Sequence, residues 1–424
     1  ALTGYNTGNF FDAKFSPDTK TVALVGNDDK FVNNTVSDLF LFDTASGNLS
    51  NMTEKFEGDV FTLLTADLEM SSSGKIVEWI DDNTYLFSAA YHGHSQLYLG
   101  NSSGVKLLTD NSEYVYDFSV LDNKTALVSI SMQTLPNSIV KLDLASGKST
   151  VLYNPNAEYE KDHEYSKPEK FSYQADDGQE LEGWYLAPLN PQRKNPVLLY
   201  VHGGPHAAYG EGFFHEFQAH AAKGDGVVFV NPRGSTGYGQ EFEHYVVGHY
   251  GEKDFTDVMS GLDYALSKYP ELDESRQYIA GGSYGGFMTT WAVGHTNRFT
   301  AAVASRSVTD WVSMWGTSDI GYHFNVSELG LDLFDEGGYE EYWRRSPMAY
   351  VNNVKTPIRM LHGEWDMRCP VTQSEEFYTG LAKNGVDADF IRYPQSFHGV
   401  SRNGLPNLRI KRLADINDWF ETHQ

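Results

Sequence analysis

The sequence predicts a chain of two unlike parts, an all-β region followed by an α/β domain built on a mostly parallel sheet. Short strands separated by polar turns fill the first part, whereas strands and helices alternate in the second. A charged, proline-bounded stretch at residues 155–168 lies between them and is expected to be a linker. A chain of 424 residues is long enough for two cores, so we place domains at 1–165 and 166–424.

Composition excludes several classes of function. The net charge of −25, from 57 acidic and 32 basic residues, repels phosphate backbones, so nucleic acid is not an expected partner. No stretch approaches the roughly 18 apolar residues of a membrane span. The single cysteine, Cys369, allows no internal disulfide, which fits a cytoplasmic location. Several Asn-x-Ser/Thr triplets leave secretion open as the alternative.

A short motif recurs in the all-β region. A strand ending in a Ser-Gly turn occurs at residues 39–48, 97–105 and 140–148, with copies about 40 to 60 residues apart. This spacing suits the four-stranded blades of a β-propeller. We expect about three blades, fewer than the four or more of a closed ring. The propeller is therefore incomplete, or another chain completes it, with a β-sandwich as the alternative.

No metal or cofactor is expected. His92 and His94 form a His-Gly-His sequence in a predicted turn, but two ligands do not make a metal site. We interpret them as surface histidines.

The second domain begins with a predicted hairpin at residues 171–186, whose turn contains Asp-Gly. Asp254 is expected to be the N-cap of a long amphipathic helix. Alternating apolar strands and helices predict a mostly parallel sheet covered on both faces, with its ligand site at the carboxyl ends of the strands. Strands are expected at 196–201, 226–230, 278–280, 299–304, 357–361 and 389–393, and helices at 214–222, 254–269, 287–293 and 411–421.

One stretch of this domain has a chemical signature. The strand at 278–280 runs into Gly281-Gly282-Ser283-Tyr284-Gly285, and an apolar helix follows. This is the pattern of a nucleophile elbow, in which only glycine fits at the positions two residues before and two residues after the serine. The helix directs its N-terminal N–H groups toward a developing oxyanion. We predict that Ser283 is a nucleophile; the alternative is a glycine-rich turn that binds an anion or makes a tight corner.

A serine nucleophile needs a base, and the base needs a carboxylate. In the elbow topology the chain order is Ser, acid, His. The strand at 357–361 leads to Asp366, and the strand at 389–393 leads to His398, so both follow consecutive strands. We predict a triad of Ser283, Asp366 and His398 on an α/β-hydrolase fold.

Other residues compete for these roles. Glu364 lies nearer its strand end and is the alternative acid. His202, His206 and His362 also border strands, but none follows the acid in the chain. Cys369 as a nucleophile would need a base of its own, so we expect a half-buried small side chain.

Two backbone N–H groups are expected to hold the oxyanion. One belongs to Tyr284, directly after the nucleophile. The other is assigned to Gly204 in the His-Gly-Gly-Pro-His segment, with Gly203 as the alternative. Removing one such donor typically costs about a hundredfold or more in rate.

Four motifs occur in a fixed order over residues 169–424: His-Gly-Gly-Pro-His (202–206), Asn-Pro-Arg-Gly-Ser-Thr-Gly-Tyr-Gly (231–239), Gly-Gly-Ser-Tyr-Gly-Gly-Phe-Met (281–288) and His-Gly-Glu-x-Asp-x-Arg-x-Pro (362–370). Together they resemble the prolyl oligopeptidase superfamily, and most of all its acylaminoacyl-peptidase and dipeptidyl-peptidase-V-like branch. The resemblance implies an α/β-hydrolase domain paired with a β-propeller that screens out folded proteins.

The resemblance also implies an activity. It points to a serine peptidase that cuts short peptides near their N-termini through an acyl-enzyme on Ser283, by acylaminoacyl or dipeptidyl release. Arg368 matches an arginine that holds a substrate backbone carbonyl; the alternative is a salt-bridging loop arginine. Cys369 stands where the family usually has an aliphatic residue or threonine. Because the propeller is shorter than the family's ring, the residues that grip the substrate N-terminus are not identified.

Two other functions stay open. One is a carboxylesterase with the same triad, and the other is a binding protein whose hydrolase domain is catalytically idle. The apolar residues around 311–322 are expected to line the primary pocket and favour a hydrophobic residue before the cut. Short peptides are the expected partners, with a homo-oligomer or a complementary propeller fragment as further partners.

Overall fold

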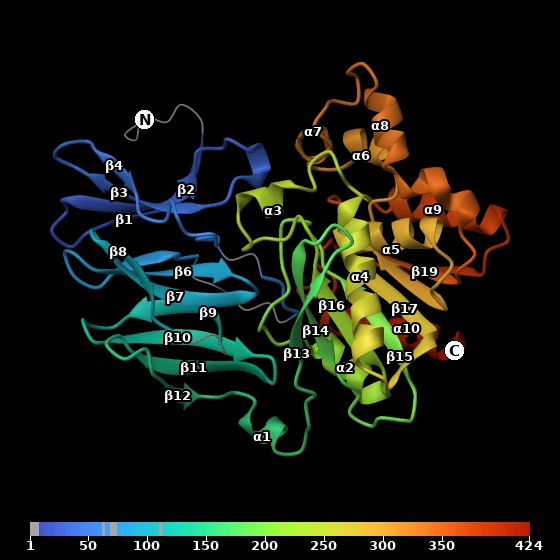
Figure 1. Ribbon diagram of the computed structural model, residues 1–424, viewed down its shortest axis with the longest axis horizontal. Coiled ribbons are helices and arrows are strands. Elements are labelled where there is room, and N and C mark those ends of the chain that lie inside the picture. Colours follow the sequence, from blue (N-terminus) through green and yellow to red (C-terminus); the bar gives the residue numbers. More distant parts are fainter. Residues whose placement is uncertain (1–7, 62–63, 68–73, 110–112) are drawn as a thin grey trace. The chain divides into compact units, whose positions relative to one another are not determined.

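The computed structural model describes residues 8–61, 64–67, 74–109 and 113–424 (Figure 1). The chain divides into two compact units. The first runs to Glu164 and also contains His206–Phe214 and Ser235–His244. The second contains Tyr165–Pro205, His215–Gly234 and Tyr245–Gln424. Two segments that follow the expected boundary at 165 thus group with the first unit.

The described part of the first unit contains three antiparallel sheets of four strands, each with its strands in chain order (Figure 1). Short helices accompany them, namely η1 (Val32–Asn34), α1 (Ala157–Glu160) and α3 (Gln240–His244). The first sheet comprises β1 (Asn9–Phe15), β2 (Thr21–Asn27), β3 (Asp38–Asp43) and β4 (Leu49–Asn51). The second comprises β5 (Val77–Trp79), β6 (Tyr85–Tyr91), β7 (His94–Asn101) and β8 (Gly104–Leu107). The third comprises β9 (Tyr114–Val120), β10 (Thr125–Met132), β11 (Leu135–Asp143) and β12 (Ser149–Tyr153).

Apolar side chains join neighbouring sheets. Val25 of the first sheet belongs to one buried cluster with Phe87 of the second. Leu86 belongs to another cluster with Val128 of the third sheet. Leu86 and Phe87 are consecutive on β6 and point to opposite faces, as the strand period of two requires. Four-stranded sheets packed face to face are the arrangement of propeller blades, as the sequence predicts.

The repeated sequence motif forms the same turn in two of the sheets. Oδ1 of Asp43 accepts the N–H of Ser46 at 2.7 Å and its hydroxyl at 2.8 Å. Oδ1 of Asp143 accepts the same groups of Ser146 at 2.8 and 2.7 Å. The glycine after each serine has a positive φ, 75° and 71°, which glycine adopts without strain. The internal repeat is therefore structural.

The second unit is built on an eight-stranded sheet of order β13-β14-β16-β15-β17-β18-β19-β20. The pairs β13–β14 and β14–β16 are antiparallel, and the remaining pairs are parallel. Continuous apolar strands such as Leu198-Leu199-Tyr200-Val201 are typical of a sheet that is buried on both faces. The strands are β13 (Glu169–Gln174), β14 (Glu180–Leu186), β15 (Asn195–Val201), β16 (Gly226–Asn231), β17 (Leu272–Gly282), β18 (Ala301–Ser305), β19 (Ile358–Gly363) and β20 (Ala388–Tyr393).

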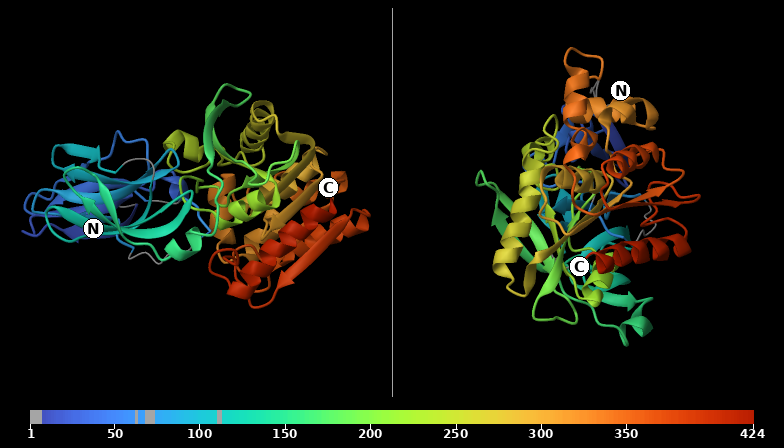
Figure 2. Two further views of the ribbon diagram at one scale, coloured as in Figure 1. Left: turned by 90° about the horizontal axis from the view of Figure 1, so that it is seen from below. Right: turned by 90° about the vertical axis from the view of Figure 1, so that its right-hand side faces the viewer.

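Helices cover both faces of this sheet (Figure 2). On one face, Arg412 of α10 pairs with Glu216 of α2. On the other face, the hydroxyl of Tyr284 on α5 donates to Asp254 on α4. The helices are α2 (His215–Lys223), α4 (Lys253–Lys268), α5 (Tyr284–His295), α6 (Trp311–Thr317), α7 (Gly321–Leu329), α8 (Gly338–Arg344), α9 (Thr372–Lys383) and α10 (Pro406–Thr422), with the 3₁₀ helix η2 (Pro347–Asn353).

The predicted strands of this unit and its four predicted helices are confirmed, and the α/β-hydrolase expectation with them. The helices α6 to α9 were not predicted, because they are short or lie beside loops without a strong apolar period. None of the helices among the described residues has the length and apolarity that crossing a membrane requires.

Candidate active site

Ser283 stands between the end of β17 and the start of α5. It has φ 62° and ψ −120°, a conformation that is rare for any residue with a side chain. The residues two positions before and after Ser283 are glycines because a larger side chain would not fit at either position. A Cβ on Gly281 would lie 2.5 Å from the carbonyl oxygen of Gly285, and a Cβ on Gly285 would lie 2.1 Å from that of Val201. This strained strand–turn–helix geometry is that of a nucleophile elbow.

Asp366 and His398 meet beyond the carboxyl ends of β19 and β20. Nδ1 of His398 donates to Oδ2 of Asp366 at 2.8 Å. Oδ1 of the buried Asp366 accepts the backbone N–H groups of Arg368 and Cys369, each at 3.0 Å. Burial raises the pKa of Asp366, but hydrogen bonds from His362 and His398 outweigh it and hold that pKa well below its ordinary range. Asp366 is therefore anionic and fixes the orientation of the His398 imidazole.

Ser283, the third residue of the predicted triad, is connected to Asp366 and His398 through Cys369. Among the described residues no hydrogen bond links the Ser283 hydroxyl to His398; that hydroxyl interacts with the thiol of Cys369. Contacts therefore run from Ser283 through Cys369 and Asp366 to His398. In unliganded enzymes catalytic hydrogen bonds are often long, and they tighten when the substrate binds.

The competing residues are engaged elsewhere. His362 is buried, with Nδ1 2.7 Å from the hydroxyl of Ser374 and Nε2 2.7 Å from the carbonyl oxygen of Cys369. Both of its ring nitrogens are thus occupied, and it is not available as the base. Glu364 pairs with Arg392 at 3.4 Å, and the carboxylate on His398 is that of Asp366. The geometry therefore favours Asp366 over Glu364 as the acid.

His398 is suited to accept a proton near neutral pH. Burial lowers its pKa to about 4. The hydrogen bond to Asp366 raises this pKa, while the positive charge of Arg306 lowers it. The imidazole is consequently neutral over the whole neutral range.

The two expected oxyanion donors lie on the two segments that border Ser283. Tyr284 is the first residue of α5, where backbone N–H groups have no partner within the helix. On the other side, a Cβ on Gly203 would lie 3.4 Å from Cβ of Ser283, so that segment passes directly beside Ser283. Gly204 follows with φ 119°, which only glycine adopts readily. The assignment of Gly204 rather than Gly203 as donor stays a prediction.

Asp254 is a residue of this site that the sequence did not reveal. The expectation that it caps α4 is wrong, because the residue at the N-cap is Glu252 and Asp254 lies inside the first turn. Its buried carboxylate accepts the hydroxyl of Tyr284 at 2.8 Å and the N–H of Gly251 at 3.1 Å. Burial raises the pKa of Asp254 to about 6. The sequence alone does not distinguish an aspartate that caps its own helix from one that accepts a hydrogen bond from a neighbouring helix.

Arg368 is half exposed and forms a two-point ion pair with Asp319, with Nε–Oδ1 at 2.8 Å and Nη2–Oδ2 at 3.3 Å. The salt bridge foreseen as the alternative is thus present. A role of Arg368 in holding substrate stays a prediction.

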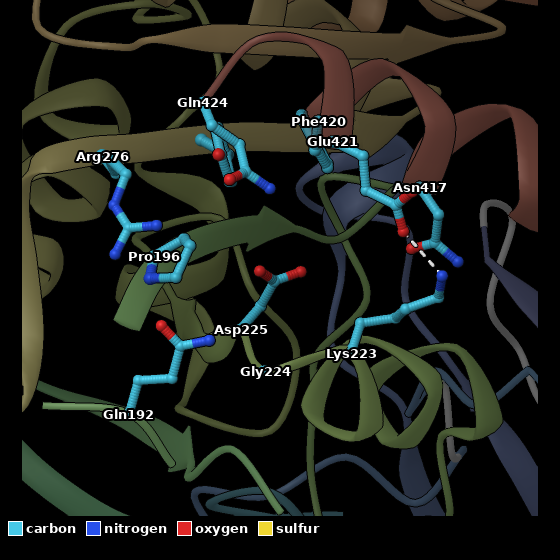
Figure 3. Close-up of a pocket in the computed structure, with 11 residues that line it drawn as sticks. Gln192, Pro196, Lys223, Gly224, Asp225, Arg276, Asn417, Phe420, Glu421 and Gln424 are labelled. Carbon is cyan, nitrogen blue, oxygen red and sulfur yellow. Dashed lines mark hydrogen bonds and ion pairs between the residues drawn. The ribbon is translucent and has the colours of Figure 1, made fainter. Parts of the chain in front are cut away.

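A pocket of about 120 Å³ lies away from these residues (Figure 3). Its lining comes from the amino-terminal side of strands β15, β16 and β17 and from α10, whereas Ser283, Asp366 and His398 follow carboxyl ends of strands. Lys223 and Glu421 form an ion pair across part of it at 2.6 Å, seen in Figure 3. Within the described part of the chain, no three His, Cys, Asp or Glu side chains are grouped so that they could hold a metal ion.

Comparison with known proteins decides the family. The profile of the prolyl oligopeptidase family matches residues 211–424, which is half of the chain. The chain belongs to this family. A Bacillus subtilis relative, the uncharacterized peptidase YuxL, is 39% identical over 402 residues, which cover 94% of this chain and 61% of the relative. The residues matched by the family profile include three of the four motifs, those at 231–239, 281–288 and 362–370.

Solved members of the family have the same fold. The Pyrococcus horikoshii acylaminoacyl peptidase is 28% identical and superposes with a TM-score of 0.85 over 98% of this chain and 63% of its own. A further solved structure, an acylaminoacyl peptidase in complex with Z-Gly-Gly-Phe-chloromethyl ketone, is 29% identical with a TM-score of 0.85, covering 97% of this chain and 62% of its own. The chain thus spans about three fifths of the length of these relatives.

Proposed function

We propose that the chain carries the catalytic machinery of a serine peptidase that cuts short peptides near their N-termini, releasing acylated amino acids or dipeptides. The observation that carries the proposal is the hydrogen bond between His398 and the anionic Asp366, on the loops next to a serine in elbow geometry. Two acylaminoacyl peptidases that share this fold at 28% and 29% identity support the choice of substrate class.

In the proposed mechanism, Nε2 of His398 takes the proton of the Ser283 hydroxyl as its oxygen attacks the scissile carbonyl carbon. Asp366 stabilises the imidazolium that forms. The N–H groups of Tyr284 and Gly204 bind the oxyanion of the tetrahedral intermediate. His398 then gives its proton to the leaving amine as the C–N bond breaks. Water, activated by the same imidazole, later hydrolyses the acyl-enzyme.

We propose a hydrophobic residue before the scissile bond. In the segment expected to line the primary pocket, Tyr322 is 66% exposed and can meet a substrate, whereas Trp311 and Met314 on α6 are buried in the core beside it. The amide of Asn325 donates to the carbonyl oxygen of Trp311 at 3.0 Å and fixes α6 against α7. The solved relative that is 29% identical contains an inhibitor whose phenylalanine adjoins the reactive group. In this proposal Arg368 holds a substrate carbonyl, for which it exchanges part of its pairing with Asp319.

The test compares turnover of acetyl-Phe p-nitroanilide, dipeptidyl p-nitroanilides and p-nitrophenyl acetate by the wild type and by Ser283→Ala. The account predicts anilide hydrolysis, with a loss of at least about 10⁴-fold in kcat in the variant. Hydrolysis of the ester alone would assign a carboxylesterase instead. Absence of all three activities in a chain with normal circular dichroism would favour an idle binding protein. The ratio of acetylated to dipeptidyl turnover separates the two forms of release.

We also propose the partners and the location. Short peptides are the substrates, and a second copy of the chain or a complementary propeller segment is the macromolecular partner, because the three described sheets are fewer than a closed ring needs. The cytoplasm is the proposed location, since one cysteine permits no internal disulfide in this chain.

A further inference from the structure

Arg306 is a buried arginine in an unusual conformation. It follows the end of β18, is 8% exposed and has φ 41°, in the left-handed region that favours glycine. Non-glycine residues in this region are strained and cluster at functional sites. Arg306 has no role in the proposed catalytic mechanism.

Arg306 differs from the other buried arginines in having no carboxylate partner among the described residues. Its hydrogen bond, from Nη1 to the Ser401 hydroxyl, is long at 3.4 Å, and its Nε has no partner. By contrast, Arg412 pairs with Glu216, and Arg233 pairs with Asp257 at 2.6 Å. A buried charge without a counter-charge is costly, so its presence needs an explanation.

The guanidinium of Arg306 fills the place that a side chain at residue 282 would occupy. A Cβ on Gly282 would lie 2.7 Å from Nη1, 2.8 Å from Cζ and 3.0 Å from Nη2 of Arg306. Gly282 precedes the nucleophile Ser283, and Ser401 lies three residues after His398. The buried cation is therefore in contact with both the nucleophile turn and the loop that carries the histidine.

We propose, on the basis of the proposed function, that Arg306 is a positioning residue whose buried positive charge adds to the effect of burial in disfavouring the imidazolium form of His398. Three groups act electrostatically on His398: Asp366 favours the imidazolium, whereas Arg306 and His362 disfavour it. Burial lowers the pKa of His398 most, the hydrogen bond to Asp366 raises this pKa, and the charge of Arg306 lowers it further. The titratable groups that interact electrostatically with Arg306 itself are Arg402, Arg412, Tyr200 and Asp366.

The test measures the pH dependence of kcat/KM in Arg306→Met and Arg306→Lys. Arg306→Met is expected to move the acid limb upward by about one pH unit, because the repulsion of the imidazolium is lost. Arg306→Lys retains the charge and is expected to keep the acid limb near the wild-type position. The Met variant should also unfold at an equal or higher temperature, since it removes an uncompensated buried charge.

A matched control removes a buried arginine together with its counter-charge, in the double variant Glu216→Gln/Arg412→Met. Its acid limb should stay unmoved because the net charge that it removes is zero. An unmoved acid limb in Arg306→Met, or an equal shift in the Met and Lys variants, would overturn the proposal. So would failure of both Arg306→Met and Arg306→Gln to fold, which would make the residue structural.

Titration of the His398 ring by NMR keeps this inference separate from the proposed function. The ring signal should titrate at a higher pH in Arg306→Met than in the wild type, whether or not the protein cleaves anilides. Lack of turnover in the wild type counts against the proposed function alone. An unchanged ring titration counts against the role of Arg306.

Discussion

At the scale of single residues, His398 is the proposed base, and its surroundings favour the neutral ring. Its pKa of about 4 lies below the ordinary 6.5, because burial disfavours the imidazolium more strongly than Asp366 favours it. Below its pKa the ring is protonated and cannot accept the Ser283 proton. We therefore expect the acid limb of kcat/KM, measured between pH 4 and 9 on an acylated anilide, to lie below 6.5. An acid limb at or above 6.5 would contradict this electrostatic account.

Asp254 supports a second prediction at this scale. Its pKa is about 6 in the folded protein against 3.8 in the unfolded chain, so the folded state retains a proton that the unfolded state loses. Its contribution to stability is thus full below pH 3.8 and is lost as the pH rises through 6, by roughly 3 kcal/mol. Asp254→Asn cannot titrate. Its melting temperature relative to the wild type should therefore rise from pH 4 to pH 7.

The matched control for this measurement is Asp263→Asn, which removes an exposed carboxylate from the same helix, α4. Its effect on the melting temperature should vary much less with pH, because solvent screens the charge. If the Asp254 and Asp263 variants followed the same pH dependence, the buried carboxylate would not be the cause. The sequence did not predict the roles of Asp254 and Arg306, because each acts through a contact with a distant segment.

At the scale of elements, the elbow depends on the close approach of the backbone at Gly285 to the backbone at the end of β15. A Cβ on Gly285 would meet the Val201 carbonyl oxygen at 2.1 Å, and a backbone atom on a central strand cannot move aside. We expect Gly285→Ala to destabilise the protein by about 3 kcal/mol and to abolish activity. The measurement is urea unfolding followed by circular dichroism.

Gly316→Ala is the control for this prediction, since a Cβ there would meet nothing within 4 Å and the residue lies in α6. It should leave stability equal or raise it by up to about 1 kcal/mol, as alanine favours helix. Equal losses of stability in Gly285→Ala and Gly316→Ala would show that steric crowding at the elbow is not the cause of the destabilisation.

Element types could be predicted where periodicity is strong. The run Leu198-Leu199-Tyr200-Val201 and the stripe of α4 have unmistakable periods, so β15 and α4 were placed within a residue or two. The short helices α6 and α8 have only about two turns each, too few for a period to emerge. The contact between Asp366 and His398 was predictable because chain order in the elbow topology indicates which strand ends carry the acid and the base.

At the scale of the whole molecule, the chain spans about three fifths of its relatives, and its described part contains three propeller-like sheets. The internal repeat predicted these sheets because the turns at Asp43 and Asp143 use the same side-chain hydrogen bonds. The grouping of residues 206–214 and 235–244 with the first unit was not predictable, since it depends on contacts between distant segments.

The proposed partner gives a prediction at this scale. Sheets short of a closed ring present strand edges that associate with other chains. We expect light scattering to give a mass above that of one chain. If the partner is a second copy, this mass should rise with concentration; if it is a complementary propeller segment, the excess should equal the mass of a second fragment. A constant single-chain mass over a hundredfold range of concentration would contradict the proposed partner while leaving the catalytic site untouched.

The central claim is that Ser283 is an activated nucleophile, and covalent labelling tests it most directly. The protein is incubated with a fluorophosphonate probe, and the modified peptide is identified by mass spectrometry. The account predicts one adduct, on Ser283, that is absent from Ser283→Ala and forms far more slowly in His398→Ala. A folded wild-type chain with no adduct, or with an adduct on another residue, would contradict the account.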